Sequence, residues 1–148
     1  MIIILGVLAF SQTEAQRTNF YTTVTNLWCK GQKTEVLAMG QSRLNINSND
    51  MAGLLIKMEY DITFLQLNEI SNSIIKVNIV SETITNTNFN AYRDSLKEDN
   101  DLMLEFLTTY TPDSIEITNE RTKSAIINKP FSSYKELEAL QKDGLIEP

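Results

Sequence analysis

Apolar residues recur every three or four positions along most of this chain of 148 residues, and this spacing is what most constrains the fold. One face of an α-helix repeats every 3.6 residues, whereas one face of a β-strand repeats every two. Five apolar stripes of the helical kind lie within residues 20–28, 36–44, 51–65, 67–84 and 89–110. We therefore predict an all-α fold of stacked helical hairpins.

The fourth stripe contains the one segment whose composition favours a different structure. Residues 74–80 are rich in isoleucine and valine and alternate in part, and β-branched residues in that pattern are typical of strands. The longer window, residues 67–84, fits the helical period better. We therefore expect a helix there. An α+β fold with a strand near residues 74–80 is the alternative.

Polar residues and glycine indicate where several helices begin and end. Asn49 or Asp50 is placed to cap the helix that starts after it, because a short polar side chain can accept a hydrogen bond from a free amide of the first turn. Ser133 followed by Glu136 matches the capping-box pattern and predicts a short helix. Gly144 is placed to end that helix.

The N-terminal segment has the pattern of an export signal. Ile2–Phe10 is an apolar run too short to span a bilayer, and Thr13 and Ala15 suit the −3 and −1 positions of a cleavage site. We expect residues 1–15 to be the signal and residues 16–148 to be a single, mostly helical domain. That domain would be secreted or periplasmic and would not insert stably in a membrane. The alternative is that the apolar run is a core element.

Composition excludes several functional classes. The formal net charge of −6 disfavours nucleic acid as a partner, because an acidic surface repels phosphates. The absence of histidine removes the commonest general base and zinc ligand. We therefore expect no metal and no other cofactor. The absence of any Asn-x-Ser/Thr acceptor favours a bacterial exported protein.

No catalytic motif is present. The chain has neither a nucleophile elbow nor a glycine-rich phosphate loop, and its densest acidic stretch, Asp99–Glu105, lacks the glycine of a calcium loop. Cys29 is the single cysteine, and we expect a buried, structural thiol. No catalytic residue is therefore predicted. Carboxylates that meet only in the folded chain remain open as an alternative.

Trp28 is the residue for which we predict a core position most directly. It shares one helical face with Phe20 and Val24, the arrangement by which a helix buries an apolar stripe. We expect its indole to pack between two helices against Val36, with Gly40 leaving room for the ring. The alternative is that Trp28 is exposed and stacks on a ligand.

The first two stripes resemble a tetratricopeptide repeat. In that family an aromatic residue, a turn glycine, a small residue and a proline recur over about 34 residues. Trp28 stands at the aromatic position and Gly31 at the turn, one residue early, whereas Val36 replaces the usual alanine and Ser48 the usual proline. Together with a second, degenerate copy, the resemblance covers roughly residues 18–85.

The resemblance implies helical hairpins stacked around a concave groove that binds a peptide or protein segment. Carried over residue by residue, it places Asn19, Asn26, Lys30 and Glu59 on that groove. We therefore expect an exported, non-catalytic protein- or peptide-binding or interaction domain. The alternative is a small α+β domain that binds a ligand or acts as a carboxylate-based enzyme on an unknown substrate.

Overall fold

The computed structural model describes residues 19–109 and 130–146, and every regular element within these two ranges is an α-helix. In chain order the helices are α3 (Asn19–Cys29), α4 (Lys33–Ile46), α5 (Met51–Thr63), α6 (Leu67–Ser81), α7 (Thr87–Thr109) and α10 (Tyr134–Lys142). The prediction of an all-α fold is confirmed. The predicted export signal, residues 1–15, lies outside the described residues.

The segment with β-branched composition, residues 74–80, lies inside α6, so the alternative of a strand there is wrong. Ile70, Ile74 and Val77 are all buried on one face of this helix. Their spacing of four and three residues suits a helix and cannot place them on one face of a strand. Burial on the helical period therefore outweighs the local strand propensity.

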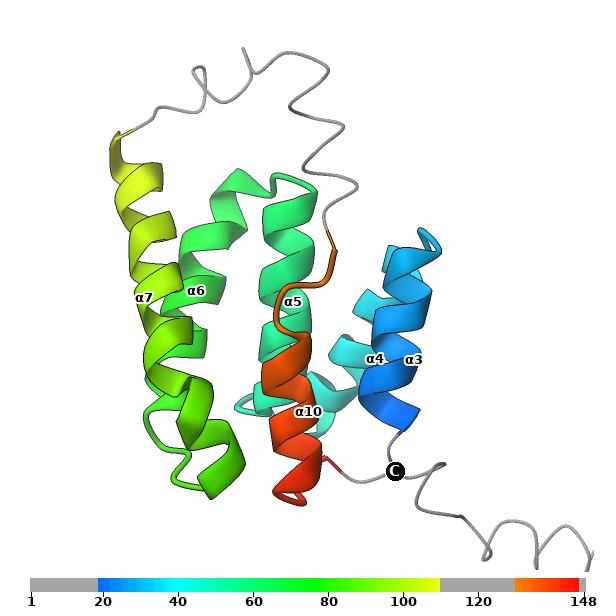
Figure 1. The fold of residues 1–148 in the computed structure, drawn as a ribbon. Coiled ribbons are helices and arrows are strands. Elements are labelled where there is room, and N and C mark those ends of the chain that lie inside the picture. Colours follow the sequence, from blue (N-terminus) through cyan, green and yellow to red (C-terminus); the bar gives the residue numbers. More distant parts are fainter. Residues whose placement is uncertain (1–18, 110–129, 147–148) are drawn as a thin grey trace, which may run out of the picture.

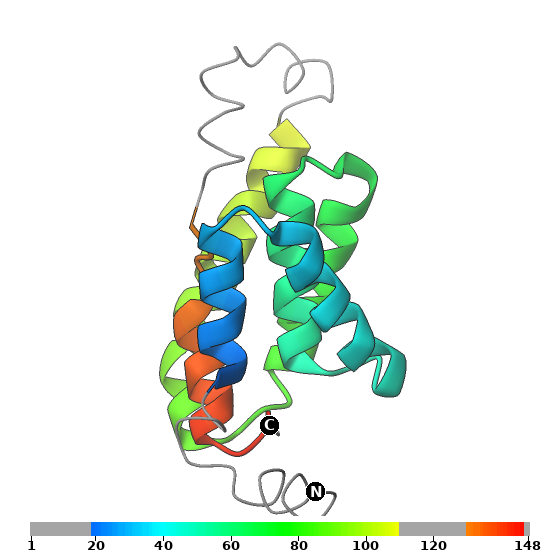
Figure 2. The same ribbon diagram turned by 90° about the vertical axis from the view of Figure 1, so that its right-hand side faces the viewer.

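The helices pack in chain order, and the last one joins the two ends of the row. Neighbouring helices from α3 to α7 contact each other in sequence, and α10 contacts α7, α3 and α5. Figure 1 shows α10 in front of α5, with α7 on one side and α3 on the other. The C-terminal helix therefore fills the space between the first and last helices of the row. Figure 2 shows the end of α4 (cyan) and the turn after it projecting from one side.

The core is centred on α5, which buries ten of its 13 residues. A helix that is apolar on nearly all sides is expected in the middle of a bundle. Trp28 of α3 is 1% exposed, and the edge of its ring meets Phe131 with the ring centroids 5.2 Å apart. The prediction that Trp28 belongs to the core is confirmed.

Two glycines allow α4 and α5 to approach each other closely. A Cβ atom on Gly40 would lie 2.7 Å from Cγ2 of Ile56, and one on Gly53 would lie 2.9 Å from the carbonyl oxygen of Gly40. No real Cβ tolerates such contacts, so each helix presents bare backbone to the other. The expectation that Gly40 makes room for the Trp28 indole is wrong, because the nearest atoms belong to α5.

Gly144 ends α10 as predicted, with a φ of 75°. The backbone amides of Gly144 and Leu145 donate to the carbonyl groups of Gln141 and Leu140, the pattern of a Schellman motif. The start of α10 differs from the prediction. Ser133 makes no capping hydrogen bond to the helix. Its hydroxyl group instead donates to the buried carboxylate of Glu59, 2.8 Å away.

Candidate functional site

An apolar groove lies where the α4–α5 turn, the C-terminal half of α6 and the end of α10 meet. Its volume is about 480 Å³, within the usual range for sites that take small molecules or side chains. We call it the end groove. Its floor is made of the buried residues Met51, Ala52, Val80 and Leu140, and its apolar walls are Ile79, Ile84 and Leu145.

The walls of the end groove expose large apolar side chains to solvent. Ile79 is 59% exposed and Leu145 is 41% exposed. Ile75 precedes Ile79 by one helical turn and is also exposed, so the apolar surface continues along α6. Ile46, next to the lining residue Asn47, is exposed as well. Exposed apolar side chains that gather around a groove mark an interaction site more often than isolated ones do.

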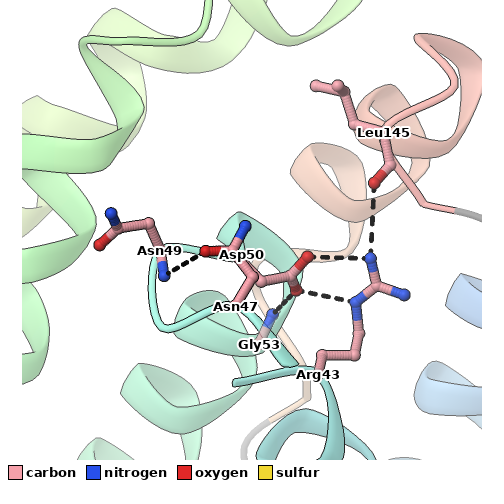
Figure 3. Close-up of polar contacts among 6 residues, drawn as sticks. All are labelled: Arg43, Asn47, Asn49, Asp50, Gly53 and Leu145. Atoms are coloured by element: carbon pink, nitrogen blue, oxygen red, sulfur yellow. Dashed lines mark hydrogen bonds and ion pairs between the residues drawn. The ribbon is translucent and has the colours of Figure 1, made fainter. Parts of the chain in front are cut away.

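One end of the groove is held rigid by Asp50, the residue that caps α5 (Figure 3). Its Oδ2 accepts hydrogen bonds from the Gly53 amide at 2.9 Å and from Nε of Arg43 at 2.7 Å. Its Oδ1 accepts a further bond from Nη2 of Arg43 at 2.9 Å. The predicted cap is confirmed at Asp50, and its charge is neutralised by a two-point ion pair.

Arg43 connects this corner to the rest of the bundle. Its Nη2 also donates to the carbonyl oxygen of Leu145 at 3.4 Å, and its guanidinium group lies 5.1 Å from the centre of the Phe20 ring. It therefore touches α3, the α4–α5 turn and the end of α10. In the same turn the Asn47 side chain accepts from the Asn49 amide at 3.0 Å, and the Asn49 side chain points away from the ion pair (Figure 3).

Lys76 gives the end groove its charge. The side chain is half-buried and lines the groove. The carboxylate on the other side of the groove, Asp50, is already paired with Arg43. Across residues 19–109 and 130–146, no carboxylate forms an ion pair with Lys76. The groove therefore combines apolar walls with one cation that is free to pair with an incoming anion.

Of the residues expected on a tetratricopeptide-like groove, Asn26 and Lys30 lie next to each other at the surface, whereas Glu59 is buried. Asn19 starts α3, and its side chain is outside the described part of the chain. Asn26 on α3 and Lys30 just after that helix are exposed, whereas Glu59 is buried in α5 and accepts from Ser132 and Ser133. None of these residues lines the end groove.

The sequence did contain a signal for the end groove. Ile75 and Ile79 lie one helical turn apart and off the buried stripe of α6, so they form a second, exposed apolar face on this helix. Cys29 is a further difference between sequence and structure. The thiol is exposed, so the prediction of a buried cysteine is wrong. Successive residues on a helix point about 100° apart, and the face of α3 that turns to the core carries Trp28.

Within the described ranges, no cluster of three or more histidine, cysteine or acidic side chains is arranged to hold a metal ion. None of the helices there is both long and apolar enough to span a membrane. Comparison with known proteins finds no match for the chain among protein families, curated proteins or solved structures.

Proposed function

We propose that this chain is a non-catalytic binding domain whose end groove holds a short apolar segment of a peptide or protein partner. The observation that carries the proposal is the position of Lys76 between exposed apolar walls. Apolar side chains of the partner would pack on Ile79 and Leu145, and one carboxylate of the partner would pair with Lys76. Peptides commonly bind in this way, with apolar anchors in a groove and polar contacts that fix their orientation.

The charge of the whole chain narrows the class of partner. A net charge of −6 repels extended polyanions, so a single carboxylate suits the groove better than nucleic acid does. The rigid corner around Asp50 favours a preformed site, because ordering a mobile loop would weaken binding. The export signal in residues 1–15 stays a prediction and would place this activity outside the cytoplasm.

The proposal is tested by selecting peptides from a displayed random library on the native protein. We expect the selected peptides to combine apolar residues with an acidic one. Ile79→Asp should abolish their binding, and Lys76→Gln should weaken it about tenfold or more, since a charge-assisted contact contributes roughly 1.5–3 kcal/mol.

Leu102→Asp is the matched control, because Leu102 is exposed to the same 59% as Ile79 but lies on α7, away from the end groove. This variant should bind the selected peptides as the native protein does. Equal binding by the Ile79→Asp variant would exclude the end groove as the peptide site.

A further inference from the structure

A second and larger cavity, of about 720 Å³, lies between α3, α7 and the start of α10. None of its lining residues lines the end groove. Lining residues recur about every helical turn on two of its walls, from Tyr21 to Cys29 on α3 and from Tyr92 to Asp99 on α7. The start of α10 forms the third wall. We call it the aromatic–acidic cavity after its main lining residues, Tyr21, Tyr92, Phe131, Tyr134, Asp99 and Glu136.

Glu136, in the first turn of α10, is the group in this cavity that has a buried oxygen without a hydrogen-bond donor. It is only 9% exposed. Its Oε2 atom is buried and has no hydrogen-bond partner in the described part of the chain. The hydroxyl groups of Ser132 and Ser133 both donate to Glu59, at 2.8 Å each. Glu136 therefore lines the cavity with a carboxylate of which one oxygen, Oε2, accepts no hydrogen bond from the described residues.

The negative charges of Glu59 and Asp99 near Glu136 favour a positively charged group beside it. Burial raises the pKa of Glu136 above its ordinary value, and the charges of Glu59 and Asp99 raise it further, although its own backbone amide and Lys135 offset part of this rise. A buried carboxylate oxygen without a hydrogen-bond donor destabilises a fold, and an apolar residue of similar size would avoid that penalty. A cation donating a hydrogen bond to this carboxylate would remove the penalty.

We propose that the aromatic–acidic cavity binds an organic cation that carries N–H donors, specifically an aliphatic primary amine. The unused Oε2 of Glu136 requires a hydrogen-bond donor, which a quaternary ammonium group lacks. The tyrosine and phenylalanine rings attract a cation through their faces and cover its aliphatic stem. An ammonium already approaches one of these rings, because Nζ of Lys135 lies 6.0 Å from the centre of the Tyr134 ring.

The volume of the cavity also agrees with a small-molecule ligand, since sites for such ligands usually measure roughly 300–1,000 Å³. Two carboxylates, Asp99 and Glu136, line the cavity against one lysine, Lys135. A diamine would match this arrangement, because each of its ammonium groups could approach one carboxylate. This site is independent of the peptide site proposed for the end groove, and either proposal can fail without the other.

The experiment is calorimetric titration of the full chain with 1,5-diaminopentane, and with tetramethylammonium as the cation without N–H donors. We expect the diamine to bind and tetramethylammonium to bind at least about tenfold more weakly. Glu136→Gln should weaken diamine binding about tenfold or more. Glu138→Gln is the matched control, because Glu138 lies on the same helix but does not line the cavity.

Thermal unfolding of each variant shows whether it is folded, so lost binding cannot be mistaken for lost structure. Absence of diamine binding to the native protein would overturn the proposal. So would equal binding by the folded Glu136→Gln variant, or binding of tetramethylammonium as tight as that of the diamine.

Discussion

The carboxylate of Asp143, at the end of α10, accepts a hydrogen bond of 2.9 Å from the backbone amide of Phe89, in the first turn of α7. The backbone and side-chain amides of Asn88 donate to its other oxygen at 3.2 and 2.8 Å. A capping side chain usually directly precedes the helix it caps. Here it comes from 54 residues later, and the contact fixes the C-terminal helix against α7.

Asp143→Asn should therefore destabilise the fold in a pH-dependent way. Burial raises the pKa of Asp143, but the hydrogen bonds from Phe89 and Asn88 outweigh it, so the pKa lies below its ordinary value. The stability that a carboxylate with a lowered pKa provides is complete above its pKa in the unfolded chain, about 4. This stability is lost as the pH falls through its pKa in the folded protein. Urea unfolding should show a loss of about 1 kcal/mol at pH 7, because asparagine is uncharged and has only one oxygen to accept the bonds that both oxygens of Asp143 accept. A loss that persists unchanged at the lowest pH would contradict this account.

Glu136→Gln should have the opposite effect. The pKa of Glu136 is raised, chiefly by burial, so the folded state favours the protonated form. The ionised carboxylate then lowers the stability of the native protein as the pH rises above the pKa of glutamate in the unfolded chain, about 4.3. The variant should be more stable than the native protein at pH 7 and equal to it below about pH 4. Urea unfolding at several pH values measures this difference. A variant that is less stable at pH 7 would show that the carboxylate has a stabilising partner.

Substitutions of Asp50 can separate its two roles at the corner of the end groove. The Asp50→Asn variant would still cap α5 but would lose the ion pair with Arg43, whereas the Asp50→Ala variant would lose both contacts. We expect Asp50→Ala to lower the free energy of unfolding by about 2 kcal/mol and Asp50→Asn by about 1 kcal/mol. Thermal or urea unfolding provides the measurement. Equal losses would mean that the cap contributes nothing, because only the Asp50→Ala variant loses it.

Gly53→Ala should destabilise the protein although alanine is the better helix former. The gain in helix propensity is about 1 kcal/mol. The new methyl group would lie 2.8 Å from Cγ of Leu44 and 2.9 Å from the Gly40 carbonyl oxygen, and the backbone oxygen cannot turn away. We expect a net loss of about 1–3 kcal/mol, the usual effect of overpacking. Gln41→Ala, at an exposed position of α4, should be nearly neutral. A more stable Gly53→Ala variant would mean that α4 and α5 can separate freely.

Much of the secondary structure could be predicted from the sequence because it depends on local periodicity. The five stripes identify α3 to α7, and they outweigh the strand propensity of residues 74–80. Local chemistry also identified Asp50 as a cap and Gly144 as a helix end. Single positions were less predictable. Ser133 fits a capping box, yet tertiary packing directs its hydroxyl group to Glu59.

The candidate sites could not be predicted because each combines segments that are distant in sequence. The end groove joins the α4–α5 turn, α6 and α10, which only the packing of α10 brings together. The cap of α7 by Asp143 is non-local for the same reason. The position of Glu59 on a groove was inferred by resemblance, and its burial depends on how α5 is surrounded. Periodicity indicates which face of a helix is buried but not which helix covers it.

Amide chemical shifts of isotope-labelled protein would show residue by residue whether the end groove binds a peptide. A peptide selected on the native protein would be added stepwise while two-dimensional spectra are recorded. We expect the largest shifts on residues lining the end groove, among them Lys76, Ile79 and Leu145. Residues of the aromatic–acidic cavity, such as Tyr92, should change little. Largest shifts in that cavity or on the outer face of α7, with the end groove unchanged, would show that the peptide binds elsewhere.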